Sequence, residues 1–183
     1  MRMFSFLKDK SIISSDAYVV GDVIDVYYES ESWVIRSIGV RGSKGLGEVL
    51  GVSAFRKPQF SLNIGAYDIN DVVLIPETRD QLQKALVADN TGTDKATALM
   101  GKKVVTDLVP IGTIADIGID LDMWRINSFK LKVEKSMAEA LDVKLGLINK
   151  TASGLLTSHI RSVTDVVSLS RKVEELRGNF TLD

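Results

Sequence analysis

The chain has 183 residues and a net charge of −1, from 23 Lys and Arg against 24 Asp and Glu. This balance provides no general attraction for a polyanion, so nucleic acid is not an expected partner. The chain has no Cys, which excludes disulfides, thiolate metal ligands and a Cys nucleophile. An apolar fraction of 45% with 26% charged residues predicts a folded globular protein.

The first seven residues are mostly apolar, but Lys8 ends the run. The run is too short for a signal sequence or a membrane span, so we expect a cytoplasmic protein without a transmembrane segment. The aromatic residues Phe4 and Phe6 either pack onto the first domain or form a small apolar lip for a partner or a membrane surface. We therefore keep both as candidate interface residues.

An internal repeat sets the domain organisation. Residues 21–52 align with residues 112–143 at a constant offset of 91, with nine identities. The identical pairs are Gly21/Gly112, Asp25/Asp116, Trp33/Trp124, Ile35/Ile126, Ser37/Ser128, Lys44/Lys135, Glu48/Glu139, Leu50/Leu141 and Val52/Val143. The repeat predicts two copies of one small domain and separates features of the fold, which repeat, from specialised features, which do not.

Alternation of polar and apolar residues predicts a strand followed by a turn and a second strand in each copy. In the second copy Asp116, Asp120 and Asp122 alternate with apolar residues, and the chain then turns into an apolar run. The parity of that run slips between Ile35 and Ile38, and again between Ile126 and Phe129. The repeated slip predicts a β-bulge of the kind that closes a small barrel.

The remaining elements are short. We expect helical turns over 44–50 and 135–141, apolar closing units over 69–75 and 163–169, and helices over 77–86 and 172–177. The connections before the closing units contain Lys57-Pro58 and Asn149-Lys150. About five short strands per copy without a βαβ pattern predict two small antiparallel barrels, over residues 1–77 and 99–183, joined by a helical linker over 78–98.

The pattern resembles the PRC-barrel family. Its opening element, a Gly and apolar residues leading to an Asp and then a turn and a strand, is similar to residues 111–126 here. Its closing element is similar to residues 69–75 and 163–169, and the Lys-x-x-Ala-Glu-x-Leu stretch at 135–141 resembles the stand-alone archaeal members. The resemblance covers nearly the whole chain as two tandem PRC-type barrels.

The resemblance implies a non-enzymatic adaptor or assembly module without a cofactor, which binds other proteins and is compatible with a homo-oligomer. In this family such modules have been linked to electron-transfer complexes, ribosome assembly and the archaeal cell-division machinery. Cell division is the expected setting, and a ribosome maturation or RNA-processing factor is the alternative. A metal- or ligand-binding barrel is the second alternative.

Trp33 and Trp124 are the only tryptophans and occupy one repeated position. They serve either barrel packing or, as exposed anchors, a partner interface. Together with Phe4 and Phe6 they are the candidate interface residues.

Other chemically distinctive residues predict no catalytic site. His159 is the only histidine, and the first copy has Gly65 in its place, so we expect a surface or loop residue. The carboxylates of Asp116, Asp120 and Asp122 suggest a cation site, but on an extended strand they span about 20 Å. The Gly42–Gly47 run fits no phosphate-loop motif and predicts a turn. Basic residues in the first half offer contacts for RNA, although solvated charge is the expected role: Arg2, Lys8, Lys10, Arg36, Arg41, Lys44, Arg56 and Lys57.

Overall fold

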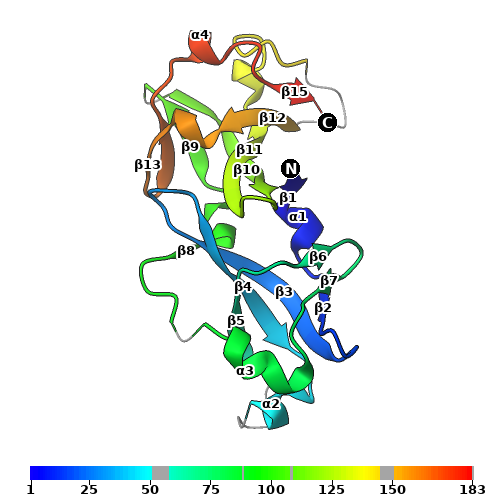
Figure 1. Ribbon diagram of the computed structural model, residues 1–183. Helices are drawn as coiled ribbons and strands as arrows, with labels where there is room; N and C mark the ends of the chain where they lie inside the picture. The colour runs from blue at the N-terminus through cyan, green and yellow to red at the C-terminus, as the bar shows by residue number, and fades with distance from the viewer. Residues whose placement is uncertain (51–57, 88, 108, 145–150, 183) are drawn as a thin grey trace. The chain divides into compact units, whose positions relative to one another are not determined.

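The computed structural model describes residues 1–50, 58–87, 89–107, 109–144 and 151–182 (Figure 1). It is mainly β, with 46% strand and 17% helix, and holds two sheets, one of them curled into a half-barrel. Lys57, Asn149 and Lys150 of the expected connections lie outside the described residues.

The chain forms two compact units. The first, here called the N-unit, is Phe6–Lys95, and the second, the C-unit, combines Met1–Ser5 with Ala96–Asp183. These boundaries differ from the predicted domains 1–77 and 99–183 and from the predicted linker 78–98. The difference arises because Arg2–Met3 pair with Gly118 and Ile119 of the C-unit, whereas Asp94–Lys95, within the predicted linker, pair with Tyr27 and Tyr28 of the N-unit.

The N-unit sheet has the strand order β5-β4-β3-β2-β7-β6, and β8 pairs with β3 off this path. Among the strand pairs of its described residues, only β2–β7 is parallel. The strands are β2 (Ser11–Ile13), β3 (Val19–Tyr28), β4 (Ile35–Gly42), β5 (Gln59–Asn63), β6 (Asp68–Ile69), β7 (Val73–Leu74) and β8 (Asp94–Lys95). Its helices are α1 (Phe4–Leu7), which begins in the C-unit arm, α2 (Leu46–Val49), the 3-10 helix η1 (Arg79–Gln81) and α3 (Leu82–Ala85).

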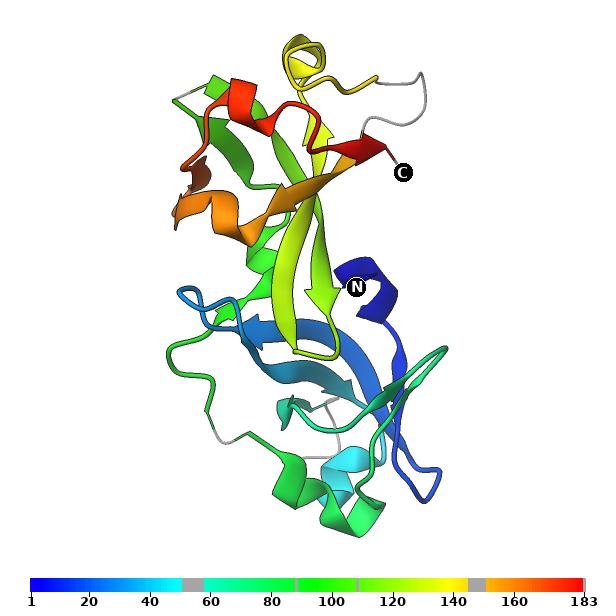
Figure 2. The same ribbon diagram turned by 45° about the horizontal axis from the view of Figure 1, so that its top comes forward.

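The C-unit sheet has the order β13-β14-β9-β10-β11-β12-β15, and β1 pairs with β10 off this path. Figure 2 shows β10 and β11 as a long twisted pair at its centre. The strands are β1 (Arg2–Met3), β9 (Lys103–Thr106), β10 (Val109–Asp120), β11 (Arg125–Val133), β12 (Thr151–Leu156), β13 (Ile160–Val163), β14 (Val166–Leu169) and β15 (Thr181–Leu182). Its helices are η2 (Ala96–Leu99), η3 (Lys135–Met137), η4 (Thr157–His159) and α4 (Val173–Leu176).

The two strand orders are the same topology. Reading β5-β4-β3-β2-β7-β6 against β12-β11-β10-β9-β14-β13 gives the same neighbours, and the parallel pair β2–β7 corresponds to the parallel pair β9–β14. The duplication predicted from the sequence is therefore confirmed at the level of strand pairing.

The predicted β-bulges are confirmed. On β4 the register slips at Arg36, because Tyr28 faces Ile35 while Tyr27 faces Ser37. On β11 the same slip falls at Asn127, between the partners of Gly118 and Ile119. A second slip, which the sequence pattern did not predict, lies just before Asp25 on β3 and just before Asp116 on β10. Each copy therefore bends its central hairpin at two equivalent places.

The arm that precedes each copy is exchanged. β1 precedes the N-unit in the chain but pairs with Gly118 and Ile119 of the C-unit. β8 precedes the C-unit but pairs with Tyr27 and Tyr28 of the N-unit, the equivalent positions at the offset of 91. Pairing with an arm satisfies backbone groups at the open side of β3 and β10. Each arm therefore completes the sheet of one unit, and the chain then continues into the other unit.

Residues 78–95 of the predicted linker belong to the N-unit, and residues 96–98 belong to the C-unit. The predicted helix over 77–86 is reduced to η1 and α3, which bury Leu82 and Ala85 as its periodicity indicated. Beyond it the amide N–H of Val87 donates to the Ser61 carbonyl at 2.9 Å. The Asn90 side chain then bridges two strands, because its Oδ1 accepts from the Ser37 hydroxyl at 2.7 Å and its Nδ2 donates to the Ser61 hydroxyl at 2.8 Å.

The repeated glycines Gly21 and Gly112 allow close approach of neighbouring backbone. A Cβ at Gly21 falls 2.3 Å from the Arg41 carbonyl oxygen, and a Cβ at Gly112 falls 2.5 Å from that of Lys132. We expect either Gly→Ala substitution to lower the free energy of unfolding of its own unit by about 1–3 kcal/mol, since backbone must move. Urea unfolding of each variant measures the loss, and an unchanged midpoint contradicts the close approach.

Candidate functional site

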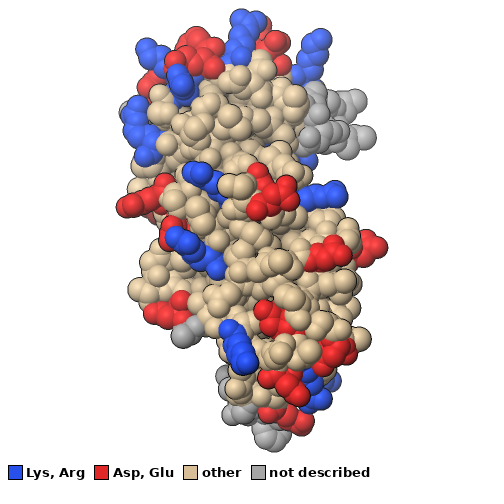
Figure 3. All heavy atoms as spheres, viewed as in Figure 1, with Lys and Arg blue, Asp and Glu red and all other residues tan. Residues whose placement is uncertain are grey.

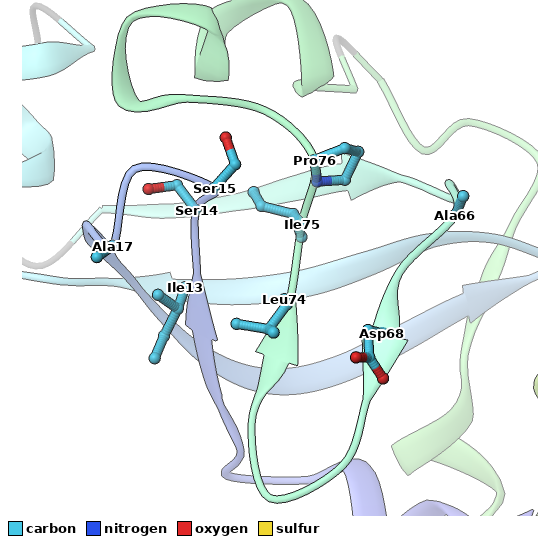
Figure 4. Close-up of a pocket in the computed structure, with 9 residues that line it drawn as sticks. All are labelled: Ile13, Ser14, Ser15, Ala17, Ala66, Asp68, Leu74, Ile75 and Pro76. Carbon is cyan, nitrogen blue, oxygen red and sulfur yellow. The ribbon is translucent and has the colours of Figure 1, made fainter.

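A mainly apolar groove of about 450 Å³ lies on the N-unit, on one face of β2, β6 and β7. We call it the N-groove. Figure 4 shows Ile13 of β2 and Leu74 of β7 side by side in its middle, with Asp68 on the next strand. Its lining is Ile13, Ser14, Ser15, Ala17, Ala66, Asp68, Leu74, Ile75 and Pro76.

Three apolar side chains form a row across this face. Val19 on β3 faces Ile13 on β2, and Ile13 faces Leu74 on β7. Residues directly opposite each other on paired strands project to the same side of the sheet. Val19 is 49% exposed and Leu74 42%, so two members of this apolar row present their side chains to solvent. With strands about 4.8 Å apart, the row spans about 10 Å, enough for two or three side chains of a partner.

The equivalent groove of the C-unit, here the C-groove, has different chemistry. It measures about 410 Å³ and is lined by Val105, Asp107, Arg161 and Ser168. Register places Ser168 where the N-groove has Leu74, because Ser168 faces Val105 as Leu74 faces Ile13. One fold therefore builds a hollow at equivalent positions twice, mainly apolar in the N-unit and lined by an acidic and a basic side chain in the C-unit.

Three carboxylates lie in or near the N-groove. Asp68 lines it, and Asp16 lies beside it, accepting from the hydroxyl of the lining residue Ser14. That hydrogen bond is the main reason why the pKa of Asp16 lies below its ordinary value. Glu77 follows Pro76 and holds the Ser15 amide through its carbonyl at 3.0 Å. Figure 3 shows acidic side chains gathered over the part of the N-unit that carries β2, β6 and β7.

Glu77 differs from the other two carboxylates in its hydrogen bonding. Within the described residues its Oε2 is buried and has no hydrogen-bond partner. Burial raises the pKa of the Tyr67 hydroxyl, and the negative charge of Glu77 raises it further. The Glu77 carboxylate therefore lies near the segment between Ala66 and Asp68. The positive charge closest in sequence, Arg79, lies over the Tyr18 ring at 4.9 Å. The Arg79 charge also contributes to the lowered pKa of Asp16, so three carboxylates and one guanidinium lie in or near the N-groove, with a negative balance.

The four interface candidates from the sequence lie elsewhere. Trp33 is 8% exposed and stacks on Tyr28 at 5.4 Å between ring centroids, and Phe4 is 2% exposed. Trp124 is half-buried, and the Phe6 ring, also half-buried, carries the Lys10 ammonium at 4.1 Å. Both tryptophans have positive φ, 62° and 46°, at the end of the repeated turn. Their conformation repeats with the fold, and their role in partner binding stays a prediction.

The repeated acidic residues do not converge. Asp116 is buried and accepts from its neighbour Ile117 N–H at 2.8 Å and from both the amide and the hydroxyl of Ser5. Asp120 instead accepts from the Asp122 and Met123 amides within the turn, each at 3.0 Å. Among the described residues no three carboxylate or imidazole groups come together as a metal site.

His159 lies at the end of η4, where its carbonyl accepts from the Ser170 amide at 2.8 Å. Its Nδ1 is buried and has no hydrogen-bond partner among the residues that the structure describes. Burial, and secondarily the Arg171 guanidinium, lower the pKa of the imidazole below its ordinary value of 6.5. The arrangement disfavours a charged imidazole in the folded protein.

This lowered pKa predicts a pH dependence of stability. The unfolded chain binds a proton at His159 more readily than the folded chain, so stability is fully present above pH 6.5. It should fall as the pH drops through that value, until the folded imidazole also becomes protonated. Urea unfolding between pH 8 and pH 5 measures the slope. We expect His159→Gln to flatten it, and a parallel slope in this variant contradicts the assignment.

The glycine run packs against neighbouring side chains, and two of the basic residues form ion pairs. A Cβ at Gly42 meets Pro58 Cγ at 2.9 Å and Leu46 Cδ2 at 3.0 Å, so the run is a packed turn. Arg36 pairs with Glu29 at 2.6 Å and Arg41 with Asp9 at 3.4 Å. Of the other basic residues, Arg56 and Lys57 lie outside the described residues.

Comparison with protein-family models and with curated proteins finds no match. Within the described part of the chain, no helix combines the length and the apolar character that a membrane crossing requires.

Proposed function

We propose that the chain is a non-enzymatic assembly module of PRC-barrel type, in which two tandem barrels share one topology and the N-groove binds a protein partner. The setting that the family resemblance implies, archaeal cell division, is part of the proposal. The observation that carries it is the apolar row of Val19, Ile13 and Leu74. Val19 and Leu74 are exposed, and Ile13 and Leu74 line the N-groove.

The contrast between the copies supports a specific role for this face. A residue needed only for the fold should be similar in both copies, as Val73 and Val167 are, both fully buried. Leu74 is exposed instead, and its equivalent in the C-unit is Ser168. An exposed leucine at a position where the same fold accepts serine contributes little to the core, and large apolar side chains in a hollow are typical binding anchors.

The test compares equivalent substitutions. Leu74→Asp places a charge in the middle of the N-groove, and Ser168→Asp makes the matched change in the C-groove. Affinity capture from native lysate of the source organism, followed by mass spectrometry, identifies partners of the wild-type chain. We expect those partners to be lost with Leu74→Asp and retained with Ser168→Asp, while the thermal unfolding midpoint of both variants stays near wild type.

Other outcomes distinguish the alternative functions. Recovery of ribosomal proteins and RNA, equally with wild type and Leu74→Asp, favours a ribosome maturation factor and contradicts N-groove binding. Recovery of cytoskeletal or membrane-anchor proteins that depends on Leu74 supports an adaptor in cell division.

A further inference from the structure

We infer that the N-groove takes a basic, apolar peptide segment of another protein, one that carries large aliphatic or aromatic side chains next to Lys or Arg. This inference rests on the proposed function and adds the chemistry of the partner. It follows from the combination of the apolar row with the carboxylates that border it.

The apolar row determines the first half of this recognition. Ile13 and Leu74 lie side by side in the hollow, and Val19 extends the row onto β3. A side chain that fills the space beside Leu74 removes apolar surface of both partners from water. The row spans about 10 Å, so two or three side chains of a peptide cover it.

The carboxylates at the border of the N-groove determine the second half of this recognition, the preference for basic side chains. Asp68 stands at the end of the row, opposite Leu74 on the next strand. Asp16 lies beside Ser14 on the other side, and Glu77 contributes an oxygen that is buried without a hydrogen-bond partner among the described residues. A buried acceptor without a donor is unfavourable, and a Lys ammonium or an Arg guanidinium of a bound peptide supplies the donor.

The C-groove provides the internal contrast. It has Ser168 where the N-groove has Leu74, and its lining includes both Asp107 and Arg161, whereas the charged residue that lines the N-groove is Asp68. A basic, apolar peptide therefore meets a leucine and a carboxylate in the N-groove, but a serine and a carboxylate that is offset by a cation in the C-groove. This difference in lining gives specificity between two sites at equivalent positions of the fold.

Selection of random peptides displayed on phage against the full chain tests the inference directly. We expect selected peptides to combine apolar side chains with Lys or Arg. Synthetic copies should bind about tenfold or more weakly to Leu74→Asp, because a central apolar anchor is lost. Binding to Ser168→Asp should be unchanged.

Charge variants separate this inference from the proposed function. Glu77→Gln and Asp68→Asn keep the shape of the N-groove, and each should weaken the selected peptides about two- to fivefold and reduce the effect of added salt. If both variants bind the selected peptides as tightly as the wild-type chain does, the inference of a basic partner is wrong, but docking at Leu74 still stands. Selection of acidic peptides, or of none, also overturns it. A dimer of the chain that dissociates in Leu74→Asp identifies a second copy as the occupant and overturns the inference as well.

Discussion

Deletion of Met1–Ser5 is expected to lower the free energy of unfolding of the C-unit by about 3–5 kcal/mol. The deletion removes β1, which pairs with Gly118 and Ile119, and it removes Phe4, which is 2% exposed. Loss of a buried Phe alone accounts for a change of this size. The N-unit, which begins at Phe6, should lose much less stability.

The two tryptophans allow this difference to be measured, because each unit contains one. A Trp33→Phe background leaves Trp124 to report on the C-unit, and a Trp124→Phe background leaves Trp33 to report on the N-unit. Urea unfolding followed by fluorescence should show a lower midpoint for the deletion in the first background. Little change is expected in the second.

The equivalent arm provides the matched control. Replacing both Asp94 and Lys95 by Gly weakens β8, which pairs with Tyr27 and Tyr28, and removes the hydrogen bond from the Ser30 hydroxyl to Asp94. The Trp33 signal should then respond more than the Trp124 signal. If both signals shift together in both variants, the arms do not belong to separate folding units.

Much of this fold follows from local sequence patterns. The identities at the offset of 91 predicted a duplicated topology, and the parity slips predicted the bulges at Arg36 and Asn127. The exchange of β1 and β8 did not follow, because Arg2–Met3 and Asp94–Lys95 are too short to carry a strand period. Their pairing depends on an open position along β10 or β3, which is a tertiary property.

The N-groove could not be predicted from the sequence for a similar reason. Leu74 belongs to an apolar closing unit that predicts burial, and Val73 beside it is buried as expected. Ile13 and Leu74 become neighbours only through the parallel pairing of β2 with β7. One signal was present in the sequence, since the second copy has Ser168 where the first has Leu74. A change from apolar to polar between equivalent positions is therefore a useful marker of a specialised face.

The repeated aspartate is expected to be the second major contributor to stability, and Asp116→Ala should destabilise the C-unit by about 2–4 kcal/mol. The carboxylate is 7% exposed and follows the bulge at Ala115. It accepts the Ile117 N–H at 2.8 Å and the Ser5 N–H at 3.2 Å, together with the Ser5 hydroxyl. Alanine leaves these donors without their acceptor in a region largely closed to water.

A double-mutant cycle shows whether Asp116 acts through the arm. Because Met1–Ser5 includes Ser5, deletion already removes two of the three donors, so Asp116→Ala should cost less in the deleted chain than in the full chain. Asp116→Asn retains one carbonyl oxygen for the Ile117 N–H and should fall between wild type and alanine. Equal losses from Asp116→Ala in both backgrounds, measured by Trp124 fluorescence, would show that the carboxylate supports the bulge alone. A smaller loss of stability in the deleted chain would show that the Asp116 carboxylate holds the exchanged arm on its sheet.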